Sequence, residues 1–192
     1  MLAGIFSAFG LSASAGLNAY IPLLVVALLA RYTQLIKLSS PWDTLTSPWV
    51  IGLLVVLIAI EFFADKVPAV NHVNDAIQTF IRPVAGALLF AASAHVITDI
   101  HPVLSLAAGL LVAGTVHVVK SVAVRPMITA TTGGVGNVPV SLAEDFTASV
   151  VSILAIVVPI FLGMVTIGLA AWLIWRWRRR SHTVRTAPSN LP

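Results

Sequence analysis

Long apolar runs constrain this chain more than any other feature of its sequence. The last of them covers residues 146–175 and contains no charged side chain. About 20 helical residues cross the roughly 30 Å hydrocarbon core of a bilayer, so this run predicts a tilted helix or a kink at Pro159. Over the whole chain, 58% of the residues are hydrophobic and 9% are charged, whereas soluble domains have about 25% charged residues. The sequence therefore predicts an all-α polytopic membrane protein.

Several shorter apolar segments precede this run. They cover residues 2–30 with an interruption inside them, residues 48–63, a stretch from Pro83 to about Asp99, and residues 102–122. Residues 68–80 place apolar side chains on one helical face and predict a short interfacial helix. We expect about five or six transmembrane helices, two of them broken or re-entrant. If the first segment is a re-entrant hairpin, the number of crossings changes parity, which leaves the side of the N-terminus open.

The length of the chain leaves room for one domain. We expect residues 1–180 to form a single integral membrane domain with possible repeat halves 1–98 and 99–180, and residues 181–192 to form a flexible cytoplasmic tail. Five basic residues follow the tryptophans that end the last run: Arg176, Arg178, Arg179, Arg180 and Arg185. An aromatic belt followed by basic residues is typical of the cytoplasmic end of a transmembrane helix. The C-terminus is therefore predicted in the cytoplasm.

Two similar polar segments interrupt the apolar sequence and predict an internal, inverted repeat. Residues 12–16 read SASAG and residues 129–133 read TATTG, and a proline follows each glycine six residues later. Glycine and proline break helices, which frees backbone groups that need polar partners at membrane depth. Paired broken helices in two halves indicate the binding site of a transporter. The alternative is that the likeness is a coincidence and that the small residues serve close helix packing.

Ionisable residues adjoin these breaks. Glu61 and Asp65 share a helical face, His117 and Lys120 are one turn apart, and Glu144 opens the last span. Charged groups inside a membrane are costly and indicate functional sites, although long side chains near helix ends can reach the interface instead. We favour an interior site for Glu61, Lys120 and Glu144. An interfacial position is expected for four others: Lys66, Arg82, Asp99 and His101.

The predicted substrate or ion pathway comprises Ser12, Ser14, Asn18, Glu61, Asp65, Lys66, His117, Lys120, Arg125, Thr129, Thr131, Thr132, Asn137, Glu144 and Asp145. The chain has no cysteine, which excludes thiolate metal sites and cysteine nucleophiles. The GGVGN segment lacks the Lys-Ser/Thr pair of a phosphate-binding loop. We expect no cofactor and name no catalytic residue, and no metal ligands are assigned.

Three stretches resemble a known family: AGLNAYIPLL, EFFADKVPAV…DAIQTFIRPVAGALL and VHVVKSVAVRP…TATTGGVGNVPVSLAEDF. Together they resemble a bacterial integral-membrane family that is known as a domain of unknown function (number 4126). The resemblance covers most of residues 10–160 and joins charged, proline and glycine positions in one order. One departure is Asn71, where the family usually has an acidic residue. The resemblance implies a protein of the inner membrane and offers no activity. The positions that match are Glu61, Asp65, Lys66, Asp75, Arg82, Lys120, Arg125, Thr129, Gly136, Asn137, Glu144 and Asp145.

These observations favour a small transporter or channel of the bacterial cytoplasmic (inner) membrane, with a site where the two breaks meet. Its expected partners are the lipid bilayer, a small polar or ionic solute and possibly a second copy of the chain, but no nucleic acid, because the basic residues cluster after the last span. One alternative is a non-catalytic scaffold, which would have dry breaks and charges only at its rims. The other is a lipid-modifying enzyme, which would have a pocket open to lipid beside His117.

Overall fold

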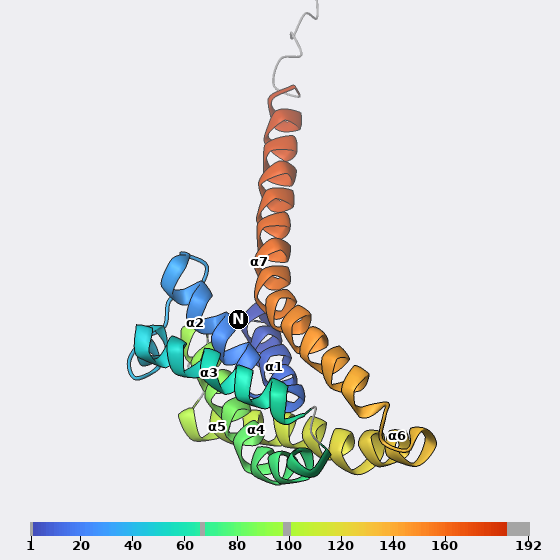
Figure 1. Ribbon diagram of the computed structural model, residues 1–192. Coiled ribbons are helices and arrows are strands. Elements are labelled where there is room, and N and C mark those ends of the chain that lie inside the picture. Colours follow the sequence, from blue (N-terminus) through green and yellow to red (C-terminus); the bar gives the residue numbers. More distant parts are fainter. Residues whose placement is uncertain (1, 66–67, 98–100, 184–192) are drawn as a thin grey trace, which may run out of the picture.

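The computed structural model describes residues 2–65, 68–97 and 101–183, and every regular element in them is helical (Figure 1). This confirms the all-α expectation. The elements in chain order are α1 (Leu2–Leu17), α2 (Tyr20–Tyr32), the 3₁₀ helix η1 (Trp42–Thr46), α3 (Pro48–Ala64), α4 (Pro68–Ile97), α5 (Pro102–Val118), the π-helix η2 (Val119–Val124), α6 (Arg125–Thr132) and α7 (Asn137–Thr183). Most of the predicted tail, residues 184–192, lies outside the described residues.

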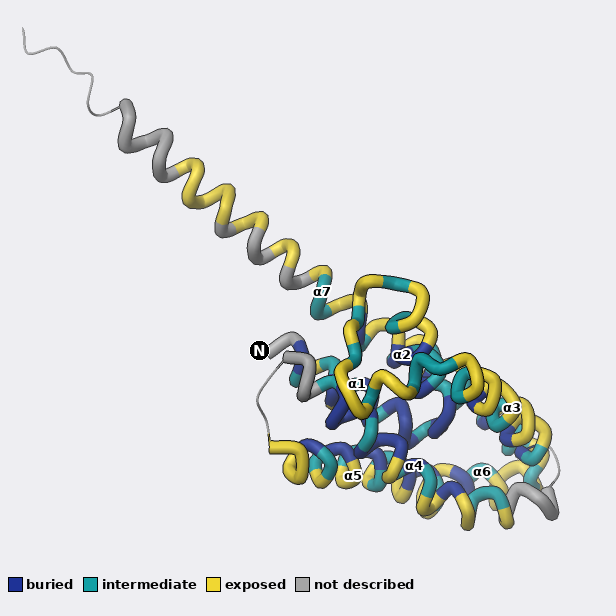
Figure 2. Tube along the Cα trace, turned by 90° about the vertical axis from the view of Figure 1, so that its left-hand side faces the viewer, coloured by how far each residue is buried: buried dark blue, intermediate teal, exposed yellow. Residues whose placement is uncertain are grey.

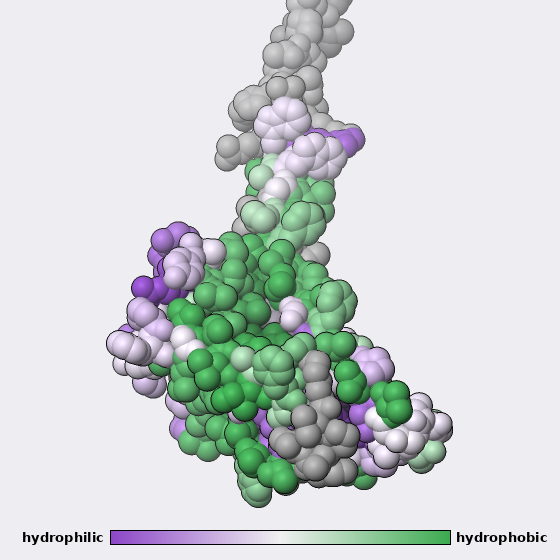
Figure 3. Space-filling model, in the orientation of Figure 1, coloured by the Kyte–Doolittle hydropathy of each residue, from purple (hydrophilic) through white to green (hydrophobic). Residues whose placement is uncertain are grey.

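Three helical segments are long and apolar enough to cross a membrane: Val73–Ser93, Pro102–Thr132 and Asn137–Phe161. Three more apolar helical segments are shorter: Gly4–Leu17, Tyr20–Tyr32 and Pro48–Ala64. Apolar residues cover most of the face seen in Figure 3, and hydrophilic ones gather beside the loop between α2 and α3 and over α6. Large apolar side chains on the outside with charged ones inside are the arrangement that a lipid solvent favours. Length, composition and exposure together indicate a membrane protein.

The interruption in the first apolar segment consists of two residues, Asn18 and Ala19. The side-chain oxygen of Asn18 accepts hydrogen bonds from the backbone N–H groups of Tyr20 (3.0 Å) and Ile21 (3.1 Å). Asn18 thereby satisfies two of the free N–H groups at the start of α2. The serines predicted at the break lie before it, inside α1. They are fully buried, and their hydroxyls donate to the carbonyls of Gly86 and Ala148, which join α1 to α4 and α7.

Helix α4 continues through Pro83, so the expected separate interfacial helix at residues 68–80 is instead the first half of α4. Its amphipathic pattern is genuine, but the polar face points inward. Val73 and Ile77 are 60% and 52% exposed, whereas Gln78 is 2% exposed. An apolar face turned outward stabilises this half of the helix in lipid, because its polar side chains find partners within the protein.

Helices α4 and α5 run antiparallel and touch at two glycines. A Cβ atom added to Gly109 would lie 2.3 Å from the carbonyl oxygen of Gly86, and one added to Gly86 would lie 2.3 Å from Cβ of Ala113. Small residues let helix backbones approach closely, which is the common way that helices pack in membranes. Figure 2 shows that buried residues gather where α1, α4 and α5 face one another. This contact fixes the register in which the polar residues of α4 and α5 meet.

Helix α7 has 47 residues, about 70 Å at ~1.5 Å per residue, and so exceeds the thickness of a bilayer core. It changes direction in the part that contains Pro159, as the sequence predicted, and its far half leads away from the other helices (Figure 1). Proline cannot bond to the carbonyl four residues earlier. That carbonyl belongs to Ala155, and the hydroxyl of Ser7 donates to it at 2.6 Å. The kink is therefore joined to α1 by a hydrogen bond.

Replacement of Gly109 by alanine tests the contact between α4 and α5. We expect Gly109→Ala to lower the free energy of unfolding by about 1–3 kcal/mol, because the added methyl group forces the two backbones apart. The control is Gly114→Ala on the same helix, where the nearest atom to the new Cβ, in Pro83, is 3.7 Å away. Unfolding in mixed micelles, followed by circular dichroism, measures both variants. Equal stability of the two variants would contradict the close contact.

Candidate functional site

Arg82 and His117 lie near the middle of the spanning segments Val73–Ser93 and Pro102–Thr132. An Nη atom of Arg82 donates to Oε1 of Glu61, in the last turn of α3, at 2.9 Å. Its other Nη lies 3.2 Å from Nδ1 of His117. The interfacial position expected for Arg82 is wrong, because the side chain is 1% exposed. The buried carboxylate of Glu61 holds it inside.

The hydrogen bonds of His117 define its protonation. A guanidinium only donates hydrogen bonds, so Nδ1 of His117 accepts from Arg82 and the ring proton sits on Nε2. Nε2 then donates to the hydroxyl of Thr79 at 3.1 Å, and this hydroxyl donates to the backbone carbonyl of Asp75 at 2.8 Å. Both ring nitrogens are occupied, and His117 is 1% exposed. The imidazole is therefore not accessible from the lipid, whereas a lipid-modifying enzyme would need a pocket that is open to lipid beside His117.

Arg125 joins three carboxylates from different elements. One Nη atom lies 2.8 Å from Asp75 on α4, and the other lies 3.2 Å from Asp65 and 3.3 Å from Glu144 on α7. Asp65 follows α3 directly and also accepts hydrogen bonds from the side chains of Asn74 and Ser141. The end of α3 and the starts of α6 and α7 are thus held to α4 by one buried guanidinium.

Lys120 connects this group to the interrupted first segment. Its ammonium lies 2.6 Å from Oε2 of Glu144 and donates to the backbone carbonyl of Leu17 at 2.9 Å. In a continuous helix this carbonyl would accept from the N–H of Ile21, but that N–H bonds to Asn18 instead. The break therefore exposes a carbonyl, and a cation binds it. Lys120 lies in the π-helix η2, a distortion that often occurs at functional sites.

Asp145 completes the contacts of the break. Its carboxylate accepts a hydrogen bond from the side-chain amide of Asn18 at 2.9 Å. The break after α1 thus contacts the first turns of α7, at a residue twelve positions beyond the TATTG segment. We name the buried group the charged cluster; it comprises Glu61, Asp65, Asp75, Arg82, His117, Lys120, Arg125, Glu144 and Asp145. Ten of the fifteen predicted pathway residues belong to the charged cluster or contact its members or its helices: Ser12, Ser14, Asn18, Glu61, Asp65, His117, Lys120, Arg125, Glu144 and Asp145.

Seven of the ten belong to the charged cluster itself, and Asn18 bonds directly to one of its members. Ser12 and Ser14 lie deeper in α1 and bond to backbone carbonyls of α4 and α7, so they pack the helices rather than line the cluster.

The threonines of the second segment lie elsewhere. Thr129, Thr131 and Thr132 are exposed, and their hydroxyls bond within α6 or to Asn137 in the turn that follows. Figure 1 shows α6 at a corner of the molecule away from α1. The expected meeting of the two Ser/Thr/Gly-rich segments is therefore wrong for these four residues, because α6 ends in a turn on the outside. Lys66, the remaining predicted residue, lies outside the described residues.

Five residues that the predicted pathway did not include belong to the cluster or bond to its side chains: Asp75, Arg82, Asn74, Thr79 and Ser141. For the first two the sequence does contain a signal. Asp75 and Arg82 are two helical turns apart and share a face of α4 with Gln78. Polar residues at this spacing beside exposed apolar ones indicate an inward polar face in a membrane helix. Ser141 has no comparable signal, because one serine in an apolar helix is common.

The charges of the cluster do not balance within the described part of the chain. Its fixed cations are Arg82, Lys120 and Arg125, and its carboxylates are those of Glu61, Asp65, Asp75, Glu144 and Asp145. Asp145 is held by a neutral amide and makes no ion pair in these residues. The described part of the chain contains no group of three or more His, Asp or Glu side chains that could hold a metal ion. The excess of negative charge comes from Asp75, Glu144 and Asp145, which are half-buried, and it favours the binding of a cation or a proton.

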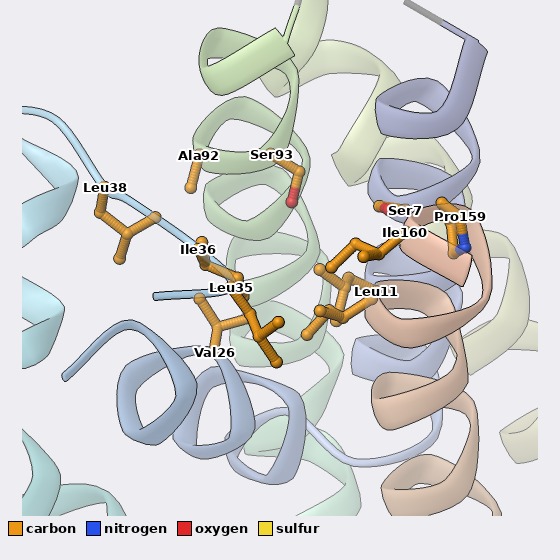
Figure 4. A pocket seen from close by; sticks show the side chains of 11 residues that line it. Ser7, Leu11, Val26, Leu35, Ile36, Leu38, Ala92, Ser93, Pro159 and Ile160 are labelled. Carbon is orange, nitrogen blue, oxygen red and sulfur yellow. The ribbon is translucent and has the colours of Figure 1, made fainter. Parts of the chain in front are cut away.

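An apolar pocket of about 150 Å³ lies about three helical turns along α1 from Asn18. Figure 4 shows Leu11, Val26 and Ile160 lining it beside Pro159. Its polar lining consists of two serines, and the hydroxyl of Ser7 already donates to Ala155. A pocket of this composition suits an apolar molecule, so the charged cluster is the better candidate site for a polar solute.

A family model described as a domain of unknown function (DUF4126) matches residues 5–179. The chain belongs to this family. The match spans every member of the charged cluster and confirms the resemblance seen in the sequence. No curated protein and no solved structure was found to match the chain. Membership in DUF4126 therefore gives the chain a family without an activity.

The pair of Lys120 and Glu144 can be tested by a double-mutant cycle. We expect Lys120→Met to lower the free energy of unfolding by about 3 kcal/mol, because it removes the donor to the carbonyl of Leu17 and leaves Glu144 with the longer contact to Arg125. The double variant Lys120→Met/Glu144→Met should lose less than the sum of the single variants. Unfolding in mixed micelles gives all three values, with Lys37→Met, on the exposed loop, as the control. Additive effects would show that the pair is not coupled.

Proposed function

We propose that this protein is a small membrane transporter or channel that carries a polar or charged solute through its helix bundle. The observation that supports this most is the charged cluster: six of its nine members are buried, and two of them, Arg82 and His117, lie near the middle of helices long enough to span a membrane. Ionisable groups inside a membrane are costly and usually serve the passage of ions, protons or substrates. Stability alone would not favour them, since apolar replacements of buried ion pairs are often neutral or stabilising.

The interrupted first segment supports the same function. Helix α1 ends and α2 begins beside the cluster, so the carbonyl of Leu17, which Lys120 binds, and the N-terminus of α2, which Asn18 caps, both lie next to it. Half-helix ends with opposite partial charges are the usual binding elements of secondary transporters. In this chain they contact Lys120 and Asp145, both on elements of the second half of the sequence. We accordingly propose that the solute site lies between the break and α7, rather than between the two similar segments.

A non-catalytic scaffold is the second candidate, because the serines of α1 are buried in dry helix contacts. A scaffold would, however, hold its charges at the rims of the bundle, and the charged cluster lies between the helices. A lipid-modifying enzyme finds less support, since both ring nitrogens of His117 are occupied. We therefore rank transport first, the scaffold second and the enzyme third.

We further propose that the protein is a multi-pass protein of the bacterial cytoplasmic membrane with its C-terminus in the cytoplasm. The support is the basic sequence after α7's tryptophans, where the guanidinium of Arg176 lies 5.1 Å from the ring centre of Trp172. The partners in this proposal are the lipid bilayer and a small polar or ionic solute, with no nucleic acid. A second copy of the chain is a further expected partner, because the far half of α7 has exposed apolar side chains.

Purified protein in liposomes on a solid-supported electrode tests transport without a known substrate. Concentration jumps of sodium, potassium, ammonium, chloride and phosphate, and jumps of pH, serve as the probes. We expect a current for at least one probe. Glu144→Gln and Asp145→Asn should reduce it by about tenfold, the effect of ~1.4 kcal/mol of lost binding free energy. Asp43→Asn, in the exposed helix η1, is the control and should leave the current unchanged.

Two results would contradict this function. The first is the absence of a current for every probe with protein that is folded and inserted. The second is an unchanged current in both Glu144→Gln and Asp145→Asn, which would remove these carboxylates from the pathway. In the first case the scaffold would become the better candidate.

A further inference from the structure

Two buried oxygen atoms beside Arg82 lack a hydrogen-bond partner in the described part of the chain. They are Oε2 of Glu61 and Oε1 of Gln78, and Nε of Arg82, a donor, is likewise buried without a partner in these residues. Glu61 is 3% exposed and Gln78 is 2% exposed. Both oxygen atoms are acceptors, so neither can satisfy the other without a hydrogen atom between them. A buried acceptor without a donor loses the hydration that it would have in water.

Contacts from three helices place these two side chains in one group. Gln78 stands one turn before Arg82 on α4, so both project from the same face of the helix. Arg82 holds the other oxygen of Glu61, from α3. Tyr20, at the start of α2, bonds to the side chain of Gln78 and lies within electrostatic range of both Glu61 and Arg82. The group therefore lies where α2, α3 and α4 meet.

The charged and titratable groups around Glu61 come from every element near it. Asp65 lies one turn further along the chain, Tyr20 approaches from α2, and Arg82 from α4. His117 on α5 contacts Arg82 from the other side, and Lys120 approaches from η2. A metal cation at Glu61 would face the guanidinium of Arg82 at close range. A proton needs no coordination shell and fits beside Arg82.

We propose that Glu61 takes up and releases a proton at Oε2, and that transport by this protein is coupled to protons or carries them. This inference rests on the proposed function. The step is a plain proton transfer: a hydronium ion gives its proton to the carboxylate and leaves as water, and the reverse reaction releases it. The new O–H becomes a donor, for which the oxygen of Gln78 is the acceptor. Glu61 is then neutral, and its attraction to Arg82 weakens.

The weakened ion pair gives the proton a structural consequence. Arg82 joins α4 to α3 through Glu61 and to α5 through His117. When Glu61 is neutral, the contact between α3 and α4 loses its charge, while the contact between α4 and α5 is unchanged. The last turn of α3 is thus the element that responds to the proton. Gln78 acts as a positioning residue, since it binds only the protonated form.

Infrared spectroscopy of the full chain in lipid tests this directly, because a protonated carboxylic acid has its own carbonyl-stretch band. We expect a band that grows as the pH falls and that Glu61→Gln removes, since glutamine keeps the acceptor for Arg82 but has no acid proton. Gln78→Leu should weaken the band at a given pH, because the protonated form loses its acceptor. Asp43→Asn, in the exposed helix η1, should leave the band as it is in the unaltered chain.

The outcomes separate this inference from the proposed function. A band of the same size in Glu61→Gln and in the unaltered chain would overturn the inference, because Glu61 would then be a permanently ionised partner of Arg82. Currents that depend on Glu144 would in that case still support transport. If Glu61→Gln removes the band while the liposome currents are absent, the proton site stands and the transport function fails.

Discussion

The bond between Lys120 and the carbonyl of Leu17 is the contact on which the interior of this protein depends. Asn18 takes the N–H groups that the end of α1 would otherwise use, and this frees the carbonyl. In apolar surroundings such a carbonyl needs a polar partner. The ammonium of Lys120 supplies it and at the same time binds Glu144, which in turn bonds to Arg125. One interrupted turn of helix thereby requires a buried cation, and the cation requires the carboxylates around it.

Close helix packing makes this arrangement possible. The contact between Gly86 and Gly109 sets the register of α4 against α5 and so brings Arg82 to His117 and Asp75 to Arg125. The serines of α1 add contacts to α4 and α7. Packing and polar contacts therefore depend on each other. If the backbones were further apart, the charged side chains would not reach their partners and would remain buried without compensation.

The positive and negative charges of the charged cluster are unequal in number, so a bound cation or proton can change the contacts between its side chains. The carboxylates of the charged cluster outnumber its fixed cations in the described residues, and Glu61 keeps one oxygen without a donor. One proton is enough to make the carboxylate of Glu61 neutral. Burying charged side chains costs free energy, and this free energy changes when an ion binds or leaves. The buried charges are therefore consistent with the proposed transport.

Much of this protein follows from its sequence alone. Hydropathy and helical periodicity are local properties of a chain, and they predicted the helices, the bend near Pro159 and the inward position of Glu61, Lys120 and Glu144. The interruption near Asn18 was also visible, although its serines lie in the helix before it.

Only the tertiary structure decided which charges meet. Leu17 and Lys120 are 103 residues apart in the sequence, and no local pattern relates them. The similar segments SASAG and TATTG suggested equal roles, but α1 is packed on several sides whereas α6 lies at a corner, so the same kind of sequence is buried in one and exposed in the other. The sequence suggested a helix boundary at Pro83, which would put Arg82 at a helix end and so at the interface. In the structure α4 continues through Pro83, and Arg82 lies well inside the helix. Sequence determines where a side chain stands on its helix, and the rotation and register of the packed helices determine what it faces.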